Sequence, residues 1–589
     1  MRKIFILVLT SILIFGCKTS QKTTVKQSDG LFSLFVEDPN SKPFFSDKKG
    51  VFSDNGMVAS AHPDASKIGV EIMKSGGNAV DAAVATHFAL AVAFPFAGNL
   101  GGGGFAVIRD KKGNAYTLDF REKAPLKAHR DMYLDAQGNV IQGLSLLGHL
   151  ASGVPGSVDG MVELHKKFGK LSWEKVMQPS IELAEKGVIL TEREAFGLNG
   201  LKKTLLQVNG ENTPYFIRKD GKIWAKGDTL IQSDLGKTLR LIQQKGRAGF
   251  YEGTVADQLV AEMQQGKGII SYEDLKLYKS AWREPLIDTY RGHKIITMPP
   301  TSSGGVALIQ LMKFVEPYPL RKWGWNSDST VQVMIEAERR VYADRAKWLG
   351  DIDFVKVPIK ELTNKDYLSK RWSDFNFAKA TDSKAVAGGT VPGYESNETT
   401  HYSVVDSEGN AVSITTTLNG AYGSKVVVDG AGFLMNNEMD DFSIKAGVPN
   451  MFGLIGNKAN EIQPQKRMLS SMTPTIVEKD GKLFLVVGTP GGSTIITSVY
   501  QTILNVIDHG MTMQQAVNAL KFHHQWLPDK TVFETNAFSE KTIKALQSRS
   551  YNIEQQKGTL GRMDCIMVHP NGKLEGASDP RADNTSVGW

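Results

Sequence analysis

The sequence has 589 residues, of which 41% are hydrophobic and 22% are charged, as is typical of a globular protein with a sizeable core. This composition excludes wholesale disorder, a collagen-like chain and a membrane protein with many spans. The formal net charge of +7 is spread over the whole length without a long Lys/Arg block, so nothing indicates binding to nucleic acid.

The first 16 residues are predicted to be an export signal. Arg2 and Lys3 form a basic start, and residues 4–15 are an apolar run too short to span a bilayer comfortably. The run ends at Gly16-Cys17, which resembles a bacterial lipoprotein signal in which the cysteine is lipidated and becomes the first mature residue. Plain secretion is the alternative.

The segment 17–49 is expected to be a tether, because its polar beginning is typical of a flexible linker after an anchor. Attachment to a membrane would then be by the lipid alone. The resulting expectation is a protein of the bacterial cell envelope, either periplasmic or an outer-membrane lipoprotein.

Cys17 and Cys565 are the two cysteines of the chain. A lipidated Cys17 leaves no intramolecular disulfide, so the fold must hold by its core alone in an oxidising compartment. So few cysteines exclude a structural zinc–thiolate site, and no HExxH pattern occurs. No metal site is therefore expected.

Helical patterns and glycine turns alternate between residues 50 and 350. Residues 64–75 are predicted to form a helix that ends at Gly76-Gly77, and Asn78 is a suitable N-cap for a second helix over 79–92. The second helix is apolar all round, which indicates burial on most sides. The glycines of 98–104 lack the spacing of a nucleotide-binding loop, so we expect them to permit close packing instead.

Two polar stretches lie further along this half. Glu336 and Glu338 belong to a helical pattern that runs to about Trp348, and we interpret them as part of a solvated helix face. Residues 356–394 are more polar and contain the Gly/Pro-rich segment 387–393, which predicts an exposed linker.

A β pattern begins at Thr399. Residues 401–406 and 411–418 are two strand-like runs, joined by the loop Ser407-Glu-Gly409. A three-residue hairpin loop with glycine last is a common type. It sets position 406 opposite 410, so that paired positions sum to 816. Thr399 is then opposite Thr417, and Asn419 shares the face of Thr417 at the same open end of the hairpin.

These threonines have two interpretations. They are either an ordinary Thr-rich strand or the surroundings of an N-terminal threonine nucleophile. A free N-terminal Thr399 carries its own base, because an α-amine has a pKa of about 7.7–8.0 and is partly neutral near pH 7. Cleavage of the Glu398–Thr399 bond must create it, and an N-to-O acyl shift by the Thr399 hydroxyl achieves this without a protease.

The segment Asn397-Glu-Thr-Thr-His-Tyr-Ser-Val-Val-Asp406 strongly resembles the processing site of the γ-glutamyltranspeptidases, N-terminal-nucleophile hydrolases that cleave themselves into a large and a small subunit. The resemblance covers roughly residues 54–589. It includes Asp119-Phe-Arg-Glu122, Pro300-Thr-Ser-Ser-Gly-Gly305, Ala343-Asp-Arg345, Leu434-Met-Asn-Asn-Glu-Met-Asp-Asp-Phe442, Leu469-Ser-Ser-Met472, Thr489-Pro-Gly-Gly-Ser493, Phe522-His-His-Gln-Trp526 and Ala577-Ser-Asp-Pro580.

The resemblance implies an α/β fold, a four-layer αββα sandwich shared by the two fragments of one precursor. The fragments would be a large subunit over 50–398, preceded by the tether, and a small subunit over 399–589, and together they would form a heterodimer. No metal and no organic cofactor is implied.

The resemblance also implies the catalytic residues. Thr399 is the nucleophile, with Thr417 beside it. Gly491 and Gly492 follow the apolar strand 483–487 and precede a helix-like run, so that their backbone N–H groups form an oxyanion hole.

The substrate-binding residues match the two charges of a γ-glutamyl group. Arg121 offers a bidentate fork to the α-carboxylate, with further donors from adjacent serines. The α-ammonium needs acceptors, and two carboxylates spaced three apart match the family's pair. We leave their neighbour Asp440 in solvent. The expected set is Arg121, Ser470, Ser471, Asn419, Glu438 and Asp441.

The loop 443–456 departs from the pattern of many bacterial members, which carry a tyrosine in the lid over the pocket. Here the matching residue is Phe452. A phenyl ring still covers the substrate, but the hydroxyl hydrogen bond is lost, so we expect a looser lid.

The function implied is transfer of a γ-glutamyl group from glutathione-like amides to water, amino acids or peptides through an ester on Thr399. Two alternatives remain open. One is an acylase of the same superfamily that acts on glutaryl side chains, which lack the ammonium. The other is a non-catalytic surface lipoprotein that keeps the fold as a binding module.

Overall fold

The computed structural model describes residues 48–589 except 212, 387–398, 446, 452 and 457. The lipidation residue Cys17, the cleavage residue Glu398, the lid residue Phe452 and the Gly/Pro-rich segment 387–393 lie outside the described residues.

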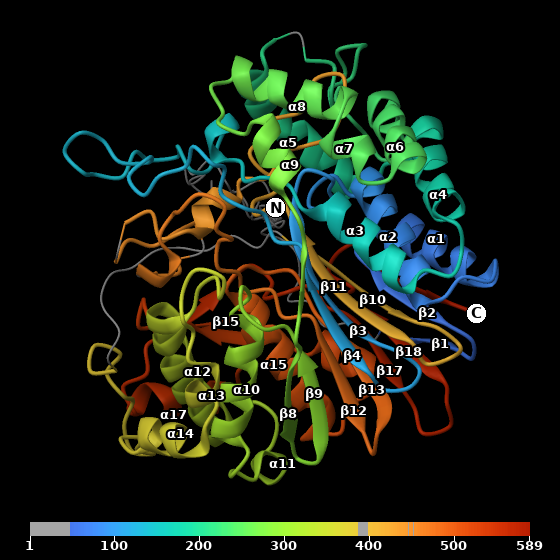
Figure 1. The fold of residues 1–589 in the computed structure, drawn as a ribbon. Coiled ribbons are helices and arrows are strands. Elements are labelled where there is room, and N and C mark those ends of the chain that lie inside the picture. The colour runs from blue at the N-terminus through green and yellow to red at the C-terminus, as the bar shows by residue number, and fades with distance from the viewer. Residues whose placement is uncertain (1–47, 212, 387–398, 446, 452, 457) are drawn as a thin grey trace, which may run out of the picture.

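Two seven-stranded sheets form the centre of the described chain and stack face to face (Figure 1). The first sheet has the order β19 (Thr585–Gly588), β2 (Met57–Ser60), β10 (Thr400–Val405), β11 (Ala411–Thr417), β3 (Gly103–Arg109), β4 (Ala115–Asp119) and β7 (Ala281–Arg283). The second has the order β1 (Val51–Ser53), β18 (Leu574–Ser578), β17 (Asp564–Val568), β13 (Lys482–Val487), β12 (Thr475–Lys479), β9 (His293–Thr297) and β8 (Leu286–Tyr290).

The side chains of the first sheet alternate between two cores, as a strand period of two requires. On β2, Met57 and Ala59 belong to one hydrophobic cluster and Val58 to another. On β3, Phe105 packs with the first cluster and Ala106 with the second. One cluster therefore fills the space between the sheets and continues beneath the helices of the second sheet, and the other lies beneath the helices of the first sheet.

Helices cover the outer face of each sheet (Figure 1). Those on the first sheet include α1 (Pro63–Lys74), α2 (Ala79–Ala93), α3 (Ser157–Phe168), α4 (Trp173–Lys186), α6 (Ser233–Lys245), α7 (Ala248–Tyr251), α8 (Thr254–Gln265) and α9 (Tyr272–Leu277), with α5 (Glu192–Asn209) beside them. Those on the second include α10 (Gly304–Val315), α11 (Leu320–Trp323), α12 (Asp328–Trp348), α14 (Lys365–Trp372), α15 (Thr494–Ile507), α16 (Met513–Asn518) and α17 (Glu540–Ser548), with α13 (Ile359–Leu362) beside them. The small sheets are β14 (Phe522–His524), β15 (Thr531–Glu534) and β16 (Ile553–Gln556), and β5 (Val188–Ile189) with β6 (Thr229–Leu230).

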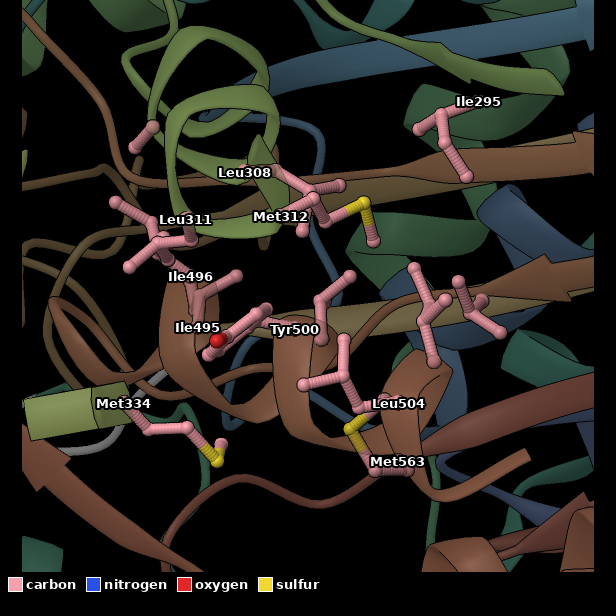
Figure 2. Close-up of a cluster of buried hydrophobic side chains, with 14 of the residues drawn as sticks. Ile295, Leu308, Leu311, Met312, Met334, Ile495, Ile496, Tyr500, Leu504 and Met563 are labelled. Carbon is pink, nitrogen blue, oxygen red and sulfur yellow. The ribbon is translucent and has the colours of Figure 1, made fainter. Parts of the chain in front are cut away.

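The layer on the second sheet is held by large apolar side chains of α10 and α15. Leu308 and Leu311 of α10 point toward Ile496 and Tyr500 of α15 (Figure 2). All four side chains are at most 3% exposed, so this contact fixes the position of α15, whose first residues follow the predicted oxyanion turn.

Both sheets combine strands from the two sides of Thr399. In the first sheet, β10 pairs antiparallel with β2 on one edge and with β11 on the other. In the second, β12 pairs with β9 of the preceding half. A chain cut at Thr399 therefore leaves two fragments that share both backbone ladders and both cores.

The first two helices agree with their prediction. α1 ends at Lys74, just before Gly76, which has a φ of +99°. Asn78 caps α2 through hydrogen bonds from the N–H groups of Val80 and Asp81, and every residue of α2 is buried. The apolar pattern indicated this burial because it leaves no polar face.

The interpretation of Glu336 and Glu338 as a solvated face is wrong, since both are fully buried. Glu336 forms an ion pair with Arg340, one turn further along α12. Glu338 accepts a hydrogen bond from the backbone N–H of His524 at 2.8 Å, and burial raises its pKa well above the usual value. Both have partners inside the fold, although Glu338 Oε1 has no hydrogen-bond partner among the described residues.

The predicted linker 356–394 is also partly wrong. It contains α13 and α14, whose Leu362 and Leu368 are buried. These two leucines anchor short helices that are otherwise polar. No helix of the described residues is long and apolar enough to cross a membrane.

Candidate active site

The hairpin places Thr399 at the open end of two central strands. β10 and β11 pair as Thr400 with Thr416 and Val405 with Ala411, so paired positions sum to 816 as predicted. Gly409 ends the loop with a φ of +84°, the left-handed conformation that glycine tolerates without strain. Thr399 directly precedes β10 and Thr417 ends β11, and both are almost fully buried.

Thr399 lines a pocket that brings nearly all the predicted site residues together. Its lining consists of Arg121, Arg345, Thr399, Thr417, Asn419, Glu438, Asp441, Leu454, Ser470, Ser471, Met472, Gly492 and Ile495. Among the predicted residues that the structure describes, Gly491 alone is outside this lining, and it adjoins Gly492. The lining draws on both sides of the predicted cleavage point.

Thr417 and Asn419 are held by a sharp turn after β11. Asn419 has a φ of +72°, and its backbone N–H donates to Thr417 Oγ1 at 2.8 Å. Its Nδ2 donates to the carbonyl of Asn437 at 2.9 Å. Within the described part of the chain, the buried Asn419 Oδ1 has no hydrogen-bond partner, so it is available as an acceptor in the pocket.

Arg121 is enclosed by acidic side chains. It contacts Glu438 through Nη1 and Asp441 through Nη2, the latter at 2.5 Å, and Glu122 lies 3.6 Å from Nη1. The expected separation, with Arg121 alone on one substrate charge and the carboxylates on the other, is not seen in this ligand-free pocket. Buried carboxylates need a counterion, and Arg121 is the cation within reach.

Burial dominates the pKa values of this cluster. It raises the pKa of Glu122 to about 7 and that of Glu438 well above its usual value, although the Arg121 charge opposes both shifts. Burial also raises the pKa of Asp441, again against Arg121. The cluster therefore combines one permanent cation with three carboxyl groups that resist ionisation.

Ser470 and Ser471 lie on a segment that runs beside the start of α10. The backbone N–H of Ser303 donates to the Ser470 carbonyl at 2.8 Å, and the Ser302 hydroxyl donates to the Met472 carbonyl at 2.5 Å. These contacts turn the two serine side chains toward the pocket that contains Thr399.

Gly491 and Gly492 form the turn between β13 and α15, with φ values of +141° and +54°. A Cβ at Gly491 would lie 2.5 Å from Thr494 Oγ1, so the turn requires glycine there. Neither N–H group donates a hydrogen bond to another described residue. Two backbone donors thus remain for a ligand beside Thr399, at the N-terminus of α15.

A polar network behind this turn reaches the lid loop. The Ser493 hydroxyl donates to Gln525 Oε1 at 2.7 Å, and Gln525 Nε2 donates to the Gly453 carbonyl at 3.1 Å. Tyr342 OH donates to the Ser493 carbonyl at 2.5 Å. Gln525 belongs to the Phe522–Trp526 motif, for which the sequence suggested no role.

Asp440 is buried rather than left in solvent, so the sequence interpretation is wrong here. It accepts hydrogen bonds from the Ser145 hydroxyl at 2.6 Å and from the Met451 N–H at 2.7 Å. Burial raises its pKa to about 7. Asn450 Nδ2 donates to Asp441 Oδ1 at 2.9 Å. Neighbouring carboxylates therefore fix adjacent residues of the lid loop.

Arg345 is the charged residue of the pocket lining that the sequence interpretation missed. It lies on α12, and its only signal was the motif Ala343-Asp-Arg345. Its Nη2 donates to Ser471 Oγ at 3.1 Å across 126 positions of the sequence. A helix pattern cannot reveal a contact over that separation.

The glycines at the start of β3 do permit close packing, as expected. A Cβ at Gly103 would lie 2.7 Å from Glu122 Oε2. The missing side chain allows Glu122 to reach Arg121 from beneath the pocket.

Comparison with known proteins supports the same assignment. A family described as gamma-glutamyltranspeptidase matches residues 65–589. The glutathione hydrolase proenzyme of Escherichia coli (strain K12) is 47% identical over 567 residues, which cover 95% of this chain and 97% of that relative. The chain belongs to the γ-glutamyltranspeptidase family.

Solved structures place this family member within a wider fold. The γ-glutamyltranspeptidase of Helicobacter pylori is 42% identical and superposes with a TM-score of 0.55 over 60% of this chain and 97% of that one. A cephalosporin acylase from Bacillus halodurans is 26% identical with a TM-score of 0.82, over 94% and 99% of the two chains. The predicted αββα N-terminal-nucleophile hydrolase fold is confirmed, and the relatives' description as proenzymes agrees with a precursor processed into two subunits.

Proposed function

We propose that this γ-glutamyltransferase and glutathione hydrolase uses Thr399 as both the self-processing residue and the catalytic nucleophile. The observation that carries the proposal is the position of Thr399, at the end of β10 in the same pocket as Arg121, Glu438 and Ser471. One hydroxyl is thereby next to the peptide bond to be cut and next to the groups that would bind a γ-glutamyl donor.

Self-processing is proposed to cut the Glu398–Thr399 bond. The Thr399 hydroxyl attacks the preceding carbonyl, an ester replaces the peptide bond, and water then hydrolyses the ester. The products would be a large subunit ending at residue 398 and a small subunit over 399–589. They stay together because β10 remains hydrogen-bonded to β2 of the large subunit.

The freed α-amine of Thr399 then acts as the base. It takes the hydroxyl proton while Oγ attacks the γ-carbonyl carbon of the donor. The N–H groups of Gly491 and Gly492 stabilise the tetrahedral oxyanion, and Thr417, held by Asn419, positions the nucleophile. The amine leaving group departs with the proton, and water or an acceptor amine resolves the γ-glutamyl ester by the same steps in reverse.

The donor's two charges are proposed to replace the internal ion pairs of the pocket. The α-ammonium binds Asn419, Glu438 and Asp441. The α-carboxylate binds Arg121, Ser470 and Ser471. Each buried charge exchanges one partner of opposite sign for another, so donor binding leaves no charge uncompensated.

This arrangement opposes the two alternatives. A glutaryl group has no ammonium and would leave Glu438 and Asp441 without a new partner, although the fold is shared with a cephalosporin acylase. A non-catalytic binding module has no need for the glycine turn at 491–492, in which Gly492 lines the nucleophile's pocket and neither N–H group donates a hydrogen bond to another described residue.

The decisive assay compares γ-glutamyl-p-nitroanilide with glutaryl-p-nitroanilide, which differ only in the α-amino group. We expect release of nitroaniline from the first at a kcat/KM at least 100-fold higher. Equal rates would favour the acylase, and no release from either compound by the cleaved protein would favour the binding module.

We also propose that Cys17 carries a lipid and holds the enzyme in the bacterial cell envelope, in the periplasm or at the outer membrane. The support is the sequence of residues 1–29 alone. The N-terminal peptide of the large subunit should carry a diacylglyceryl group on Cys17 by mass spectrometry. An unmodified peptide that begins at another residue would indicate plain secretion.

A further inference from the structure

The donor pocket contains a second arginine in a different environment from Arg121. Arg345 is 5% exposed and projects from α12 into the lining of the pocket. Its Nε donates to Ser303 Oγ at 2.9 Å and its Nη2 to Ser471 Oγ at 3.1 Å. Both partners are neutral hydroxyl groups.

The two arginines differ in their compensation by carboxylates. Arg121 contacts Glu438 and Asp441 and lies 3.6 Å from Glu122. Within the described part of the chain, no carboxylate is within 4.0 Å of Arg345. Burial lowers the pKa of Arg345 to about 10, with Asp441 acting in the opposite direction, so its guanidinium stays protonated near pH 7.

A buried cation without a counterion is costly, which makes an anionic ligand its natural complement. The Arg121 cluster by itself is a poor site for such an anion, because its carboxyl groups outnumber its single cation. A donor carboxylate approaching that cluster alone meets a site whose own acids already occupy the guanidinium.

We propose that Arg345 is a specificity-determining residue that binds the α-carboxylate of the donor together with Ser471, an inference that rests on the proposed function. Ser471 Oγ accepts a hydrogen bond from Arg345, so its own hydrogen is directed elsewhere and strengthened as a donor. The Arg345 guanidinium and the Ser471 hydroxyl thus converge on one anion. Arg121 and Ser470 bind the same carboxylate, and Asn419, Glu438 and Asp441 bind the ammonium of the donor.

A purely structural role gives a different expectation. By joining Ser303 to Ser471, Arg345 could simply hold the 470–472 segment against the start of α10. Loss of that contact would disturb every substrate alike, whether or not it carries a carboxylate.

The test compares γ-glutamyl-p-nitroanilide with 4-aminobutyryl-p-nitroanilide, which lacks only the α-carboxylate. Single-turnover acylation with enzyme in excess keeps a slow reaction measurable. For Arg345→Gln we expect the γ-glutamyl rate to fall by about 10- to 150-fold, the range for one hydrogen bond to a charged group. The 4-aminobutyryl rate should change by less than about threefold.

Arg345→Lys keeps the positive charge but not the bidentate guanidinium. It should therefore restore part of the preference for the γ-glutamyl over the 4-aminobutyryl substrate that Arg345→Gln loses. Lys347→Gln removes a charge from an exposed position of the same helix and should leave both rates unchanged. Ser471→Ala, which leaves Arg345 in place, should lower the γ-glutamyl rate relative to the 4-aminobutyryl rate. This variant provides the test if the Arg345 variants fail to fold.

Equal losses for the two substrates, or an unchanged γ-glutamyl rate, in the self-cleaved variants would overturn the proposal. Such a result would leave the proposed function intact as long as the parent enzyme releases nitroaniline from the γ-glutamyl substrate. A parent that fails to do so would instead contradict the proposed function itself.

Discussion

The end of the β10–β11 hairpin and the loop over the pocket are held in opposite ways. Backbone ladders on both edges fix β10, which begins directly after Thr399, and Thr399 itself is buried. The loop 443–456 has little regular structure and is tied down mainly by side chains, with Asp440 and Gln525 bonding its backbone. In the proposed mechanism, the chemistry that needs fixed geometry is thus on the sheet, and control of access is on the loop.

This contrast predicts the largest effect at the hairpin. Thr399→Ala should remain a single uncleaved chain without transferase or hydrolase activity, because one hydroxyl starts both reactions. A denaturing gel and the nitroanilide assay check this. The matched control is Thr400→Val, since the buried Thr400 hydroxyl has no partner among the described residues and its isosteric loss should leave cleavage intact. Two fragments from Thr399→Ala would contradict autocatalysis.

The next largest effect is expected at the floor of the pocket. Arg121→Lys should weaken donor binding by about 1.5–3 kcal/mol, roughly 10- to 150-fold, because a point charge cannot replace a fork that also spans Glu438 and Asp441. The KM of the donor under conditions of slow chemistry is the measurement. Arg130→Lys, at an exposed pair with Asp131, should have no effect. A donor affinity within twofold of the parent would remove Arg121 from the site.

A smaller effect is expected where the loop meets the sheet, at Asp440. Its folded-state pKa of about 7 is above the usual carboxyl value, so the folded chain holds a proton that the unfolded chain releases near pH 4. The contribution of this group to stability therefore declines as pH rises from about 4 to 7 and is constant above.

Asp440→Asn removes that titration while keeping an oxygen acceptor for the Met451 N–H. The Tm of the variant minus that of the parent should increase by about 1–4 °C between pH 5 and pH 7.5. Thermal unfolding at both pH values measures it. A difference that stays constant with pH would mean that Asp440 titrates near its usual value.

The smallest effect is expected in the lid. Phe452→Tyr should shift the partition from hydrolysis toward transfer by at most about tenfold, since a single neutral hydrogen bond is worth about 0.5–1.5 kcal/mol. The alternative is that loop length and acceptor-site shape set the partition. The measurement that distinguishes the two explanations is the ratio of γ-glutamyl-acceptor product to free glutamate at one acceptor concentration. An unchanged ratio with intact self-cleavage would favour the alternative.

The same contrast explains what the sequence could predict. The hairpin register followed from a three-residue loop with Gly409 last, because local backbone geometry determines it. The α2 helix and its burial followed from an apolar pattern and one N-cap. Most site residues came from the family resemblance, which supplied partners that no local pattern shows.

The failures involve partners that are distant in sequence. Glu338 accepts a hydrogen bond from His524 across 186 positions, and Arg345 donates one to Ser471 across 126 positions. Asp440 was placed in water because an acidic run is usually solvated, but Ser145 and the loop bury it. A polar side chain is assigned to the surface by default, and its burial depends on contacts that only the folded chain reveals.

The most direct test of the central claim is the intact mass of the purified protein after rapid mixing with a γ-glutamyl donor and quenching. The account predicts two fragments, the smaller beginning at Thr399, with one γ-glutamyl group added to the small fragment and located on Thr399 by peptide mapping. A single uncleaved chain, or a γ-glutamyl group attached to any other residue, would contradict it.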